Sequence, residues 1–299
     1  MSALLLLVAC LLLGALIGRA ARPPPALAQS LNWWVLNIAF SALVLHLTPT
    51  LRFDRELWFL AASMWAVFLG AWALFATLGR ALRWSRARVG ALTLAGGFGA
   101  TAFIGFPLIE ALHGQEALKL ALVADQLGCF LAVAVGGVIV AALYSGRRAE
   151  PAAIARRVLT FPPLVSLGVG AIVGVAGGWP DAVDAILQRL GATLIPMALF
   201  SIGLQLRLQF QSGQLGALAL ALGYKLALAP LAIWFVSIAI GVSDDIRTVA
   251  VLEAAMAPQI TATILAEQND LEPQLAVSIL GIGIVLSLVT APFVSYLIG

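Results

Sequence analysis

The sequence predicts an all-α polytopic membrane protein, and three observations support that prediction. Of the 299 residues, 62% are apolar and only 10% are charged, and the mean hydropathy is +1.03, far outside the range of soluble domains. The apolar residues form runs long enough to cross a bilayer, which takes roughly 20 residues of helix. The charged residues gather in the connections between these runs, and little of the chain is left for a soluble domain.

The apolar runs resolve into ten predicted transmembrane helices, at about residues 2–18, 30–48, 56–79, 89–112, 117–143, 159–177, 182–204, 214–240, 247–267 and 274–298. The longest polar connection, 147–158, lies near the midpoint and divides the chain into a first half, 1–146, and a second half, 159–299. Each half has five helices. Because five is an odd number, the second half inserts upside down relative to the first, so we expect an inverted repeat.

The arginines predict the orientation of the chain in the membrane. Eleven of them lie in the connections after odd-numbered helices: Arg19, Arg22, Arg80, Arg83, Arg86, Arg88, Arg147, Arg148, Arg156, Arg157 and Arg207. The other connections hold four, which are Arg52, Arg55, Arg189 and Arg247. By the positive-inside rule, connection 147–158 is a cytoplasmic linker and both termini lie outside the cytoplasmic (inner) membrane. The net charge of +3 is therefore explained by the orientation of the chain in the membrane, and it implies no nucleic-acid partner.

The start of the chain and the two cysteines add little to this picture. The first apolar run has no basic leader before it, so we expect an uncleaved first helix rather than a signal peptide. Cys10 and Cys129 both fall within apolar runs, which implies no disulfide framework.

Two predicted helices are interrupted in matching places. Residues 101–107 (TAFIGFP) and 253–259 (EAAMAPQ) put Gly, Pro and polar groups near the centre of membrane-length segments. Lipid cannot hydrogen-bond a freed backbone amide, so such breaks persist only where protein or a water-filled cavity supplies partners. The positive end of a half-helix also attracts anions. Two broken helices crossing at mid-membrane therefore predict a small polar binding site, and packed proline kinks are the alternative.

Ionisable residues are concentrated in some of the predicted helices. Lys225 lies near the centre of the eighth, where an ammonium needs a carboxylate partner or an anionic substrate unless its stem reaches the interface. Asp125 and Glu253 lie within the fifth and ninth, as candidates for proton coupling or as structural partners of Lys225. Helices 1, 2, 6 and 7 hold almost no such residues and predict a lipid-facing, dimer-forming scaffold. Helices 3–5 and 8–10 predict a core bundle.

No metal ion or cofactor is expected from the sequence. His46 and His113 have no Cys, Asp or Glu nearby at the spacing of metal ligands.

The sequence around the first interrupted segment, 101–107, resembles that of a known family. Residues 105–114 (GFPLIEALHG) resemble the fourth-helix motif of the auxin efflux carrier family, which includes plant PIN-type exporters and bacterial organic-anion permeases. Supporting matches are 195–204 (IPMALFSIGL), Lys225 with Pro230, and 256–258 (MAP) leading to Leu265 and Ala266. The resemblance extends to the bile-acid/sodium symporter-like superfamily. It implies ten helices in two inverted repeats, with broken helices 4 and 9 crossing at their centres, and often a homodimer.

The chain departs from the pattern of this family at two positions. Ala100 stands where the family usually has Asn, and Ala257 replaces the first of two prolines. The expected fold is unaffected by both changes. The substrate is left open, because the missing amide is one of the groups that would hold a carboxylate.

Together these features predict a secondary transporter of a small organic anion (a carboxylate, auxin-like or dicarboxylate) that works by an alternating-access, elevator-like mechanism. The residues expected to bind the substrate are Thr101, Gly105, Pro107, Pro258, Gln259, Thr261 and Lys225, with Asp125 or Glu253 taking a proton. Two alternatives stay open: a sodium-coupled symporter of the bile-acid type and a membrane ligand-sensing module. An intramembrane enzyme is disfavoured, since no catalytic pair such as HExxH is present.

The arginine asymmetry yields a test of the orientation. In a variant without Cys10 and Cys129, single cysteines inserted after Gly79 and after Ser145 should be shielded from impermeant thiol reagents in intact cells. A cysteine added at the C-terminus should react, because that end is predicted to lie outside. Labelling after Gly79 and Ser145 with a protected C-terminus would reverse the orientation.

Overall fold

The computed structural model describes residues 2–21, 23–24, 26–51, 54, 56–206 and 212–298, and nearly all of them are helical. Four arginines used to predict the orientation, Arg22, Arg52, Arg55 and Arg207, lie outside the described residues. Within the described part of the chain, β-type pairing is limited to one isolated bridge between Gly99 and Pro258.

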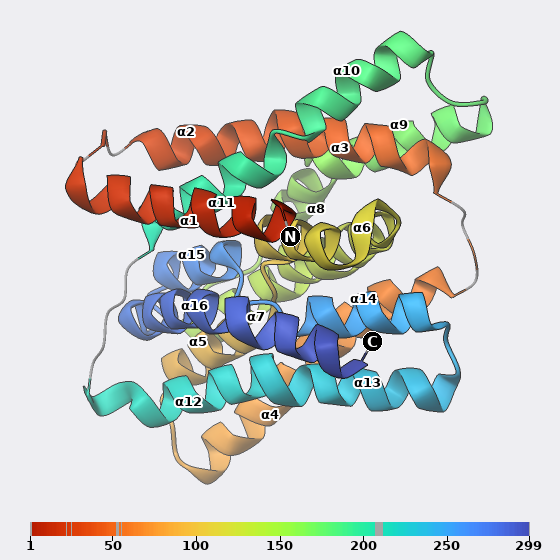
Figure 1. Ribbon diagram of the computed structural model, residues 1–299. Helices are drawn as coiled ribbons and strands as arrows, with labels where there is room; N and C mark the ends of the chain where they lie inside the picture. The colour runs from red at the N-terminus through yellow and green to blue at the C-terminus, as the bar shows by residue number, and fades with distance from the viewer. Residues whose placement is uncertain are drawn as a thin grey trace.

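The helices follow one another along the chain with short connections (Figure 1). The α-helices are α1 (Ser2–Ala20), α2 (Ala26–Trp34), α3 (Phe40–Leu47), α4 (Leu57–Ala81), α5 (Arg86–Gly97), α6 (Phe106–Val123), α7 (Val138–Ser145), α8 (Pro151–Leu159), α9 (Pro162–Val175), α10 (Asp181–Gly191), α11 (Leu194–Gln205), α12 (Leu215–Gly223), α13 (Ala229–Ile240), α14 (Asp244–Ala254), α15 (Ile260–Gln268) and α16 (Pro273–Ile298). Wider π-helical turns are η1 (Val35–Ala39), η3 (Thr101–Gly105), η4 (Ala124–Phe130), η5 (Ala132–Gly137) and η7 (Tyr224–Leu228), and 3₁₀ turns are η2 (Thr48–Thr50) and η6 (Ser212–Gln214).

Local sequence signals set several helix ends. Ser85 caps α5, since its hydroxyl accepts a hydrogen bond from the backbone N–H of Arg88 at 3.1 Å. Gly146 and Gly241 follow α7 and α13 with φ of 78° and 77°, the left-handed conformation that glycine adopts at low cost.

Six helical stretches of the described chain are long and apolar enough to cross a membrane: Ala26–Thr50, Leu57–Ala81, Thr101–Ser145, Asp181–Gln205, Leu215–Ile240 and Pro273–Ile298. A seventh is formed if α8 and α9, which are bent by 53°, count as one span. The prediction of an all-helical, multi-pass membrane protein is therefore confirmed. The count of ten helices and the inverted repeat stay predictions.

The stretch Thr101–Ser145 is too long to be a single crossing. Its 45 residues would extend about 68 Å as one helix, against a hydrocarbon core of about 30 Å. Gly114 interrupts it with φ 81° and ψ −174°, so the helix ends before Gly114 and a second helix follows. The helix is thus broken at the glycine, between the predicted spans 89–112 and 117–143.

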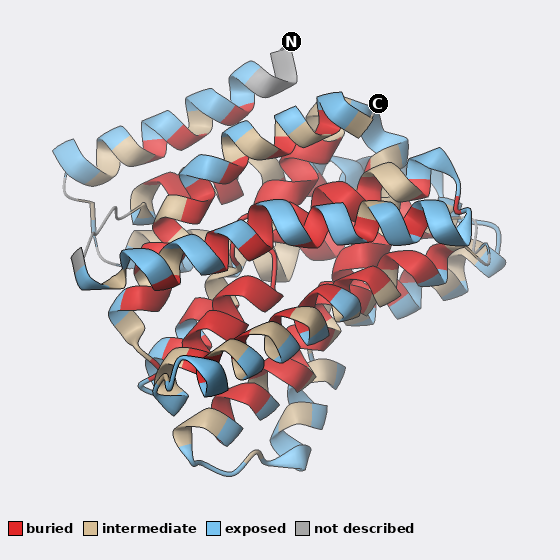
Figure 2. Cartoon of the chain, turned by 90° about the horizontal axis from the view of Figure 1, so that it is seen from below, coloured by how far each residue is buried: buried red, intermediate tan, exposed pale blue. Residues whose placement is uncertain are grey.

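The helices form two layers (Figure 1). One layer contains α1, α2, α3, α9, α10 and α11, in which α1 and α2 pack on α11 and α3 packs on α9 and α10. The other contains α4–α7 and α12–α16. Buried residues are concentrated in the interior of the molecule, and exposed residues cover its outer surface (Figure 2). The two layers contain the same parts of the chain as the predicted scaffold and core, and these two roles stay predictions.

Helix α4 supports the interior of the second layer. Phe68 stacks on Phe98 with ring centroids 4.8 Å apart. Phe75 meets Tyr224 edge-on at 5.9 Å, and the Tyr224 hydroxyl donates to the Val67 carbonyl oxygen at 2.6 Å. These contacts fix the position of η7 and of the break after α5.

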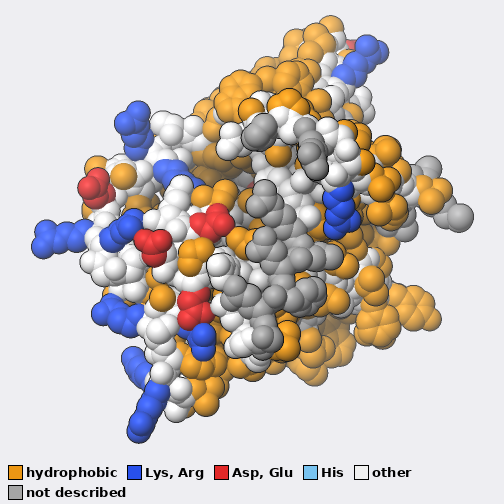
Figure 3. Space-filling view, turned by 90° about the vertical axis from the view of Figure 1, so that its left-hand side faces the viewer, with side chains coloured by type: hydrophobic (Ala, Val, Ile, Leu, Met, Phe, Trp, Pro, Cys, Tyr) orange, Lys and Arg blue, Asp and Glu red, His pale blue; other side chains and the backbone are white. Residues whose placement is uncertain are grey.

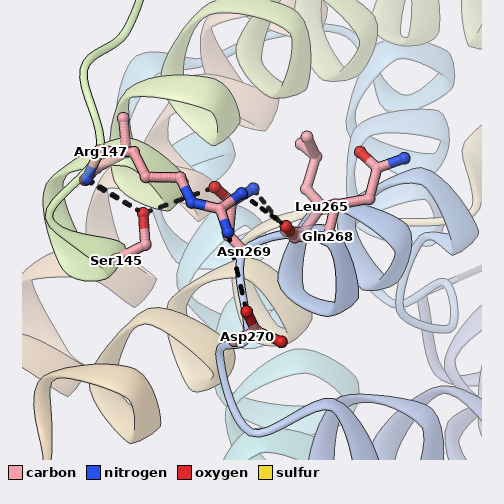
Figure 4. Close-up of polar contacts among 7 residues, drawn as sticks. Ser145, Arg147, Leu265, Gln268, Asn269 and Asp270 are labelled. Carbon is pink, nitrogen blue, oxygen red and sulfur yellow. Dashed lines mark hydrogen bonds and ion pairs between the residues drawn. The ribbon is translucent and has the colours of Figure 1, made fainter.

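The face of the molecule seen in Figure 3 carries a group of Lys or Arg side chains with a few Asp or Glu side chains among them. The side chain of Arg147 connects the two halves of the chain (Figure 4). Its guanidinium donates to the Gln268 carbonyl oxygen at 2.8 Å and lies 3.7 Å from the Asp270 carboxylate. Ser145 adds a bond of 3.4 Å to the side chain of Asn269. A cation at the carboxyl end of α15 also complements the helix dipole, so these contacts anchor that end of the helix.

The packing of α1 on α11 yields a test of the first layer. An added Cβ at Gly203 would lie 2.3 Å from the Leu11 carbonyl oxygen, whereas one at Gly168 in α9 would meet nothing within 4 Å. Gly203→Ala should therefore lower the thermal stability of the purified protein, by about 1–3 kcal/mol of overpacking. Gly168→Ala, the control, should leave stability equal or slightly higher. Equal melting curves for the two variants would contradict the close contact of α1 with α11.

Candidate functional site

The two interrupted segments cross and pair with each other. The backbone is extended at Phe98, directly after α5, and again at Gln259, directly before α15. The Ala100 N–H donates to the Ala257 carbonyl oxygen at 2.7 Å, and the Gln259 N–H donates to the Phe98 carbonyl oxygen at 3.1 Å. Backbone groups that the breaks free from helical bonding thus satisfy one another, as an environment without water requires.

The first break lies earlier in the chain than predicted. Residues 101–107 were expected to be broken, but Thr101–Gly105 forms η3 and Pro107 is the second residue of α6. Proline is tolerated in the first turn of a helix, where an N–H would be unpaired in any case. The unwound residues are Phe98, Gly99 and Ala100. The second break was placed correctly, since Pro258 lies in the bridge between α14 and α15.

The crossing collects the ends of four half-helices. The carboxyl ends of α5 and α14 meet there, and η3 and α15 begin there. The first N–H groups of a helix have no partner within it and carry partial positive charge, whereas the last carbonyls carry partial negative charge. An anion is therefore favoured beside η3 and α15, and a cation beside α5 and α14.

Lys225 lies on the side that favours a cation. Its side chain is 1% exposed, on the π-helical turn η7. A Cβ added at Gly99 would lie 3.0 Å from Lys225 Nζ and 3.2 Å from the Glu253 carbonyl oxygen, so the ammonium lies against the crossing backbone. Among the described residues, Nζ has neither a hydrogen-bond partner nor a carboxylate within ion-pair distance. The helix ends supply part of its stabilisation.

Two buried carboxylates complete the charged cluster, and their surroundings differ. Asp125 on η4 accepts hydrogen bonds from the Thr101 hydroxyl and, at 2.7 Å, from the Gln126 amide. Glu253 on α14 is fully buried, and neither of its carboxylate oxygens has a hydrogen-bond partner in the described part of the chain. A Cβ at Gly105 would lie 2.6 Å from Glu253 Oε2, so the glycine leaves room for this carboxylate.

The remaining predicted residues occupy different positions around the cluster. Thr101 and Gly105 contact Asp125 and Glu253 respectively. Gln259 uses its backbone in the crossing, while its side-chain carbonyl oxygen is buried without a partner among the described residues. Pro107 is buried in α6, and Thr261 is partly exposed in the first turn of α15. Among the described residues, Thr261 makes no hydrogen bond to Lys225, Asp125 or Glu253.

Sequence reasoning missed three residues at the crossing. Gly99 gives room to Lys225, Gln126 binds Asp125, and the Cys129 thiol lies 3.3 Å from the Gly99 carbonyl oxygen, to which it donates. Gln126 carries a detectable signal, since an amide next to Asp125 within an apolar helix needs a polar partner. The other two residues are ordinary for a membrane helix and carry none.

Two cavities lie at opposite ends of the molecule. The first has a volume of about 500 Å³ and lies between α1, α2 and α11 on one side and α15 and α16 on the other. Its polar lining residues include Gln205, Thr263 and Glu267. The other, of about 600 Å³, has His113, Lys119 and Asp245 among its lining residues. Neither is lined by the charged residues of the crossing. The crossing is therefore closed off from both cavities in this conformation.

Comparison with known proteins shows which protein family this chain resembles. The family model described as "Membrane transport protein" matches residues 1–295. An uncharacterised transporter of Methanothermobacter thermautotrophicus is 27% identical over 275 residues, covering 89% of this chain and 87% of the relative. An uncharacterised transporter of Methanocaldococcus jannaschii is 28% identical over 124 residues, which is 40% of this chain and 39% of that protein.

The family match spans nearly the whole chain, including both crossing segments and the helices that carry the charged cluster. The resemblance seen in the sequence around Gly105 and Pro107 is thereby confirmed. The chain belongs to the membrane transport protein family of the auxin efflux carriers, and it is a multi-pass transport protein rather than an enzyme.

Proposed function

We propose that this protein is a secondary transporter that moves a small organic anion, a carboxylate of auxin-like or dicarboxylate type, across the cytoplasmic membrane. The observation that carries the proposal is the convergence of a buried cation, Lys225, and two half-helix amino ends at one crossing. Positive potential held inside the membrane without a matching carboxylate in contact favours an anionic ligand.

The substrate would bind on the amino-end side of the crossing. The N–H groups in the first turns of η3 and α15 carry partial positive charge, which would attract the anion. The side-chain carbonyl oxygen of Gln259 has no hydrogen-bond partner among the described residues and could accept a hydrogen bond from a donor group of the ligand. Thr261 offers a hydroxyl beside these groups, and Pro107 and Pro258 shape the backbone. Lys225 contributes by potential rather than by contact, since Gly99 lies between it and the opposite segment.

An arrangement of ten helices in two inverted repeats would explain why the chain has two broken helices that cross. Each half then contributes one broken helix, and the crossing lies on the pseudo-twofold axis between them. The break at Gly114 supports ten crossings, because a stretch of 45 residues that is interrupted there has room for two spans. The linker 147–158 would be cytoplasmic and both termini outside.

Alternating access would come from an elevator-like movement of one layer against the other. The two cavities support this proposal, because the one lined by Gln205 and Thr263 lies at the boundary of the layers and ends next to the second break. Contacts between the layers include Phe40 of α3 on Phe106 of α6, with ring centroids 5.3 Å apart. Such apolar contacts resist sliding less than hydrogen bonds would.

The outer face of the first layer suits lipid or a second copy of the chain. Ile172 and Val175 of α9 are 72% and 93% exposed, and Ile186 of α10 is 59% exposed. We propose a homodimer through this layer, which would hold the scaffold still while the core moves.

Two rival functions remain, and one assay separates them. A bile-acid-type symporter would accumulate the anion only with sodium, and a ligand-sensing module would bind it without transport. Uptake of radiolabelled organic acids into proteoliposomes, with and without sodium and with a pH gradient, distinguishes both from the proposed carrier.

Breaking the crossing tests the site. Pro258→Ala supplies a backbone N–H and allows α14 and α15 to join, which would displace the Gln259 bond to Phe98. Uptake of a transported acid should fall tenfold or more, equivalent to about 1.4 kcal/mol, in protein that still folds. The control is Pro292→Ala, which removes a proline within α16, away from the crossing. Normal uptake by Pro258→Ala would place the site elsewhere.

Removing the buried cation tests the class of substrate. Lys225→Met keeps the length of the side chain and removes its charge, so acid binding should weaken about tenfold or more. Lys119→Met, which removes a lysine paired at 2.8 Å with Glu116, is the matched control and should bind normally. If Lys225→Met binds acids as tightly as the wild type, the lysine serves only to stabilise the helix ends. A preference of the wild type for neutral or cationic ligands would rule out the organic-anion proposal.

A further inference from the structure

The two carboxylates of the crossing were equal candidates for proton coupling, but their surroundings separate them. Asp125 has a donor for each oxygen, the Thr101 hydroxyl for Oδ1 and the Gln126 amide for Oδ2. Hydrogen bonds donated to a carboxylate favour its ionised form. Asp125 is therefore better placed than Glu253 to hold a negative charge.

Glu253 has the opposite surroundings. It is 0% exposed, and in the described part of the chain no donor reaches either of its oxygens. No lysine, arginine or histidine of the described chain lies within 4.0 Å of its carboxylate. A buried carboxylate that lacks both hydrogen bonds and a close cation is far more stable with a proton than as an anion.

The charged neighbours of Glu253 also favour a protonated carboxyl group at this position. The charged neighbours of its carboxylate are Asp125 on η4 and Lys225 on η7. Two neighbouring carboxylates do not both ionise readily, so one of them holds a proton. Cys129 on η4, the other titratable group of the cluster, acts on Lys225.

The other elements packed on α14 add little charge near Glu253. The segments η3, α13 and α16 contain no charged residue. Helix α4 has only Arg80, in its last turn. The ionisable residues of α6 begin at Glu110, five positions beyond the Gly105 that Glu253 contacts.

We infer that Glu253 is the proton-binding residue of the crossing, and that one proton on Glu253 accompanies each substrate anion. The second part rests on the proposed function. The proton binds to and leaves a carboxylate oxygen of Glu253, and no other bond changes. With Asp125 ionised and Lys225 charged, an anion entering beside Gly105 would face an ionised Glu253 as a like charge. Anion binding and protonation of Glu253 therefore favour each other, as linkage requires.

This coupling predicts how affinity depends on pH. Only the fraction of molecules with Glu253 protonated binds the anion well, so the apparent Kd rises as that fraction falls. In the wild type, Kd should increase by up to about tenfold per pH unit on the alkaline side of the titration. Glu253→Gln mimics the protonated form and should bind at all pH values as the wild type does at low pH.

The experiment uses the full chain in lipid nanodiscs and compares the wild type with Glu253→Gln and Asp125→Asn. Infrared difference spectra across a pH series detect the C=O stretch of a buried protonated carboxyl group, a signal that needs no substrate. The wild type and Asp125→Asn should show this band, and Glu253→Gln should lack it. A band lost in Asp125→Asn would overturn the assignment, even if Glu253→Gln gave no folded protein.

Binding of radiolabelled indole-3-acetate and L-malate over the same pH series tests the coupling. A pH-dependent Kd in the wild type and a constant Kd in Glu253→Gln support it. An equal pH dependence in both proteins would overturn the coupling while leaving the proposed transport of anions intact. If neither acid binds any variant, the coupling and the proposed function fail together, and the infrared result still decides whether Glu253 holds the proton.

Discussion

The exchange of backbone hydrogen bonds between two broken helices is the interaction on which the rest of this structure depends. An unpaired N–H or C=O in hydrocarbon costs several kcal/mol, so neither α5 nor α14 can end inside the membrane by itself. The pairing of Phe98 and Ala100 with Gln259 and Ala257 removes that cost for both. It also fixes where four helix ends meet, and therefore where partial charges of both signs collect inside the protein.

The buried charges follow from that arrangement. Lys225 lies against the carboxyl ends of α5 and α14, and glycine at position 99 provides the space. The π-helical turns η4 and η7 carry Asp125 and Lys225, and such turns are frequent at functional sites because they widen the helix and re-aim side chains. Helix α4 contacts both turns. Met64 of α4 packs on Gly128 of η4, and the Val67 carbonyl oxygen of α4 accepts a hydrogen bond from the Tyr224 hydroxyl of η7. A rigid support behind the crossing keeps a costly cluster in one geometry.

The sequence was informative where the physics of the bilayer acts on single residues, and less so where two segments must meet. Apolar runs predicted the helices, and Lys225, Asp125 and Glu253 were singled out because charge is expensive in lipid. The first break was misplaced because Pro107 was taken as the breaking residue, whereas a proline in a first turn leaves the helix intact. The true break uses Gly99, which is indistinguishable in sequence from the glycines that allow close helix packing. The hydrogen bonds that separate Asp125 from Glu253 depend on contacts between elements, which no spacing rule supplies.

The two departures from the family pattern now have a physical account. Ala100 and Ala257 replace a common Asn and Pro, and both contribute to the crossing through backbone atoms alone, with side chains buried. The crossing therefore needs nothing from those side chains that alanine lacks. In the proposed function, an Asn would add an amide to the ligand site, and with Ala100 in its place the contacts with a carboxylate would fall to the N–H groups of η3 and α15. A site that bound an anion through backbone donors and a cation at a distance would recognise charge before side-chain shape, so the proposed carrier would accept a class of small anions rather than one compound.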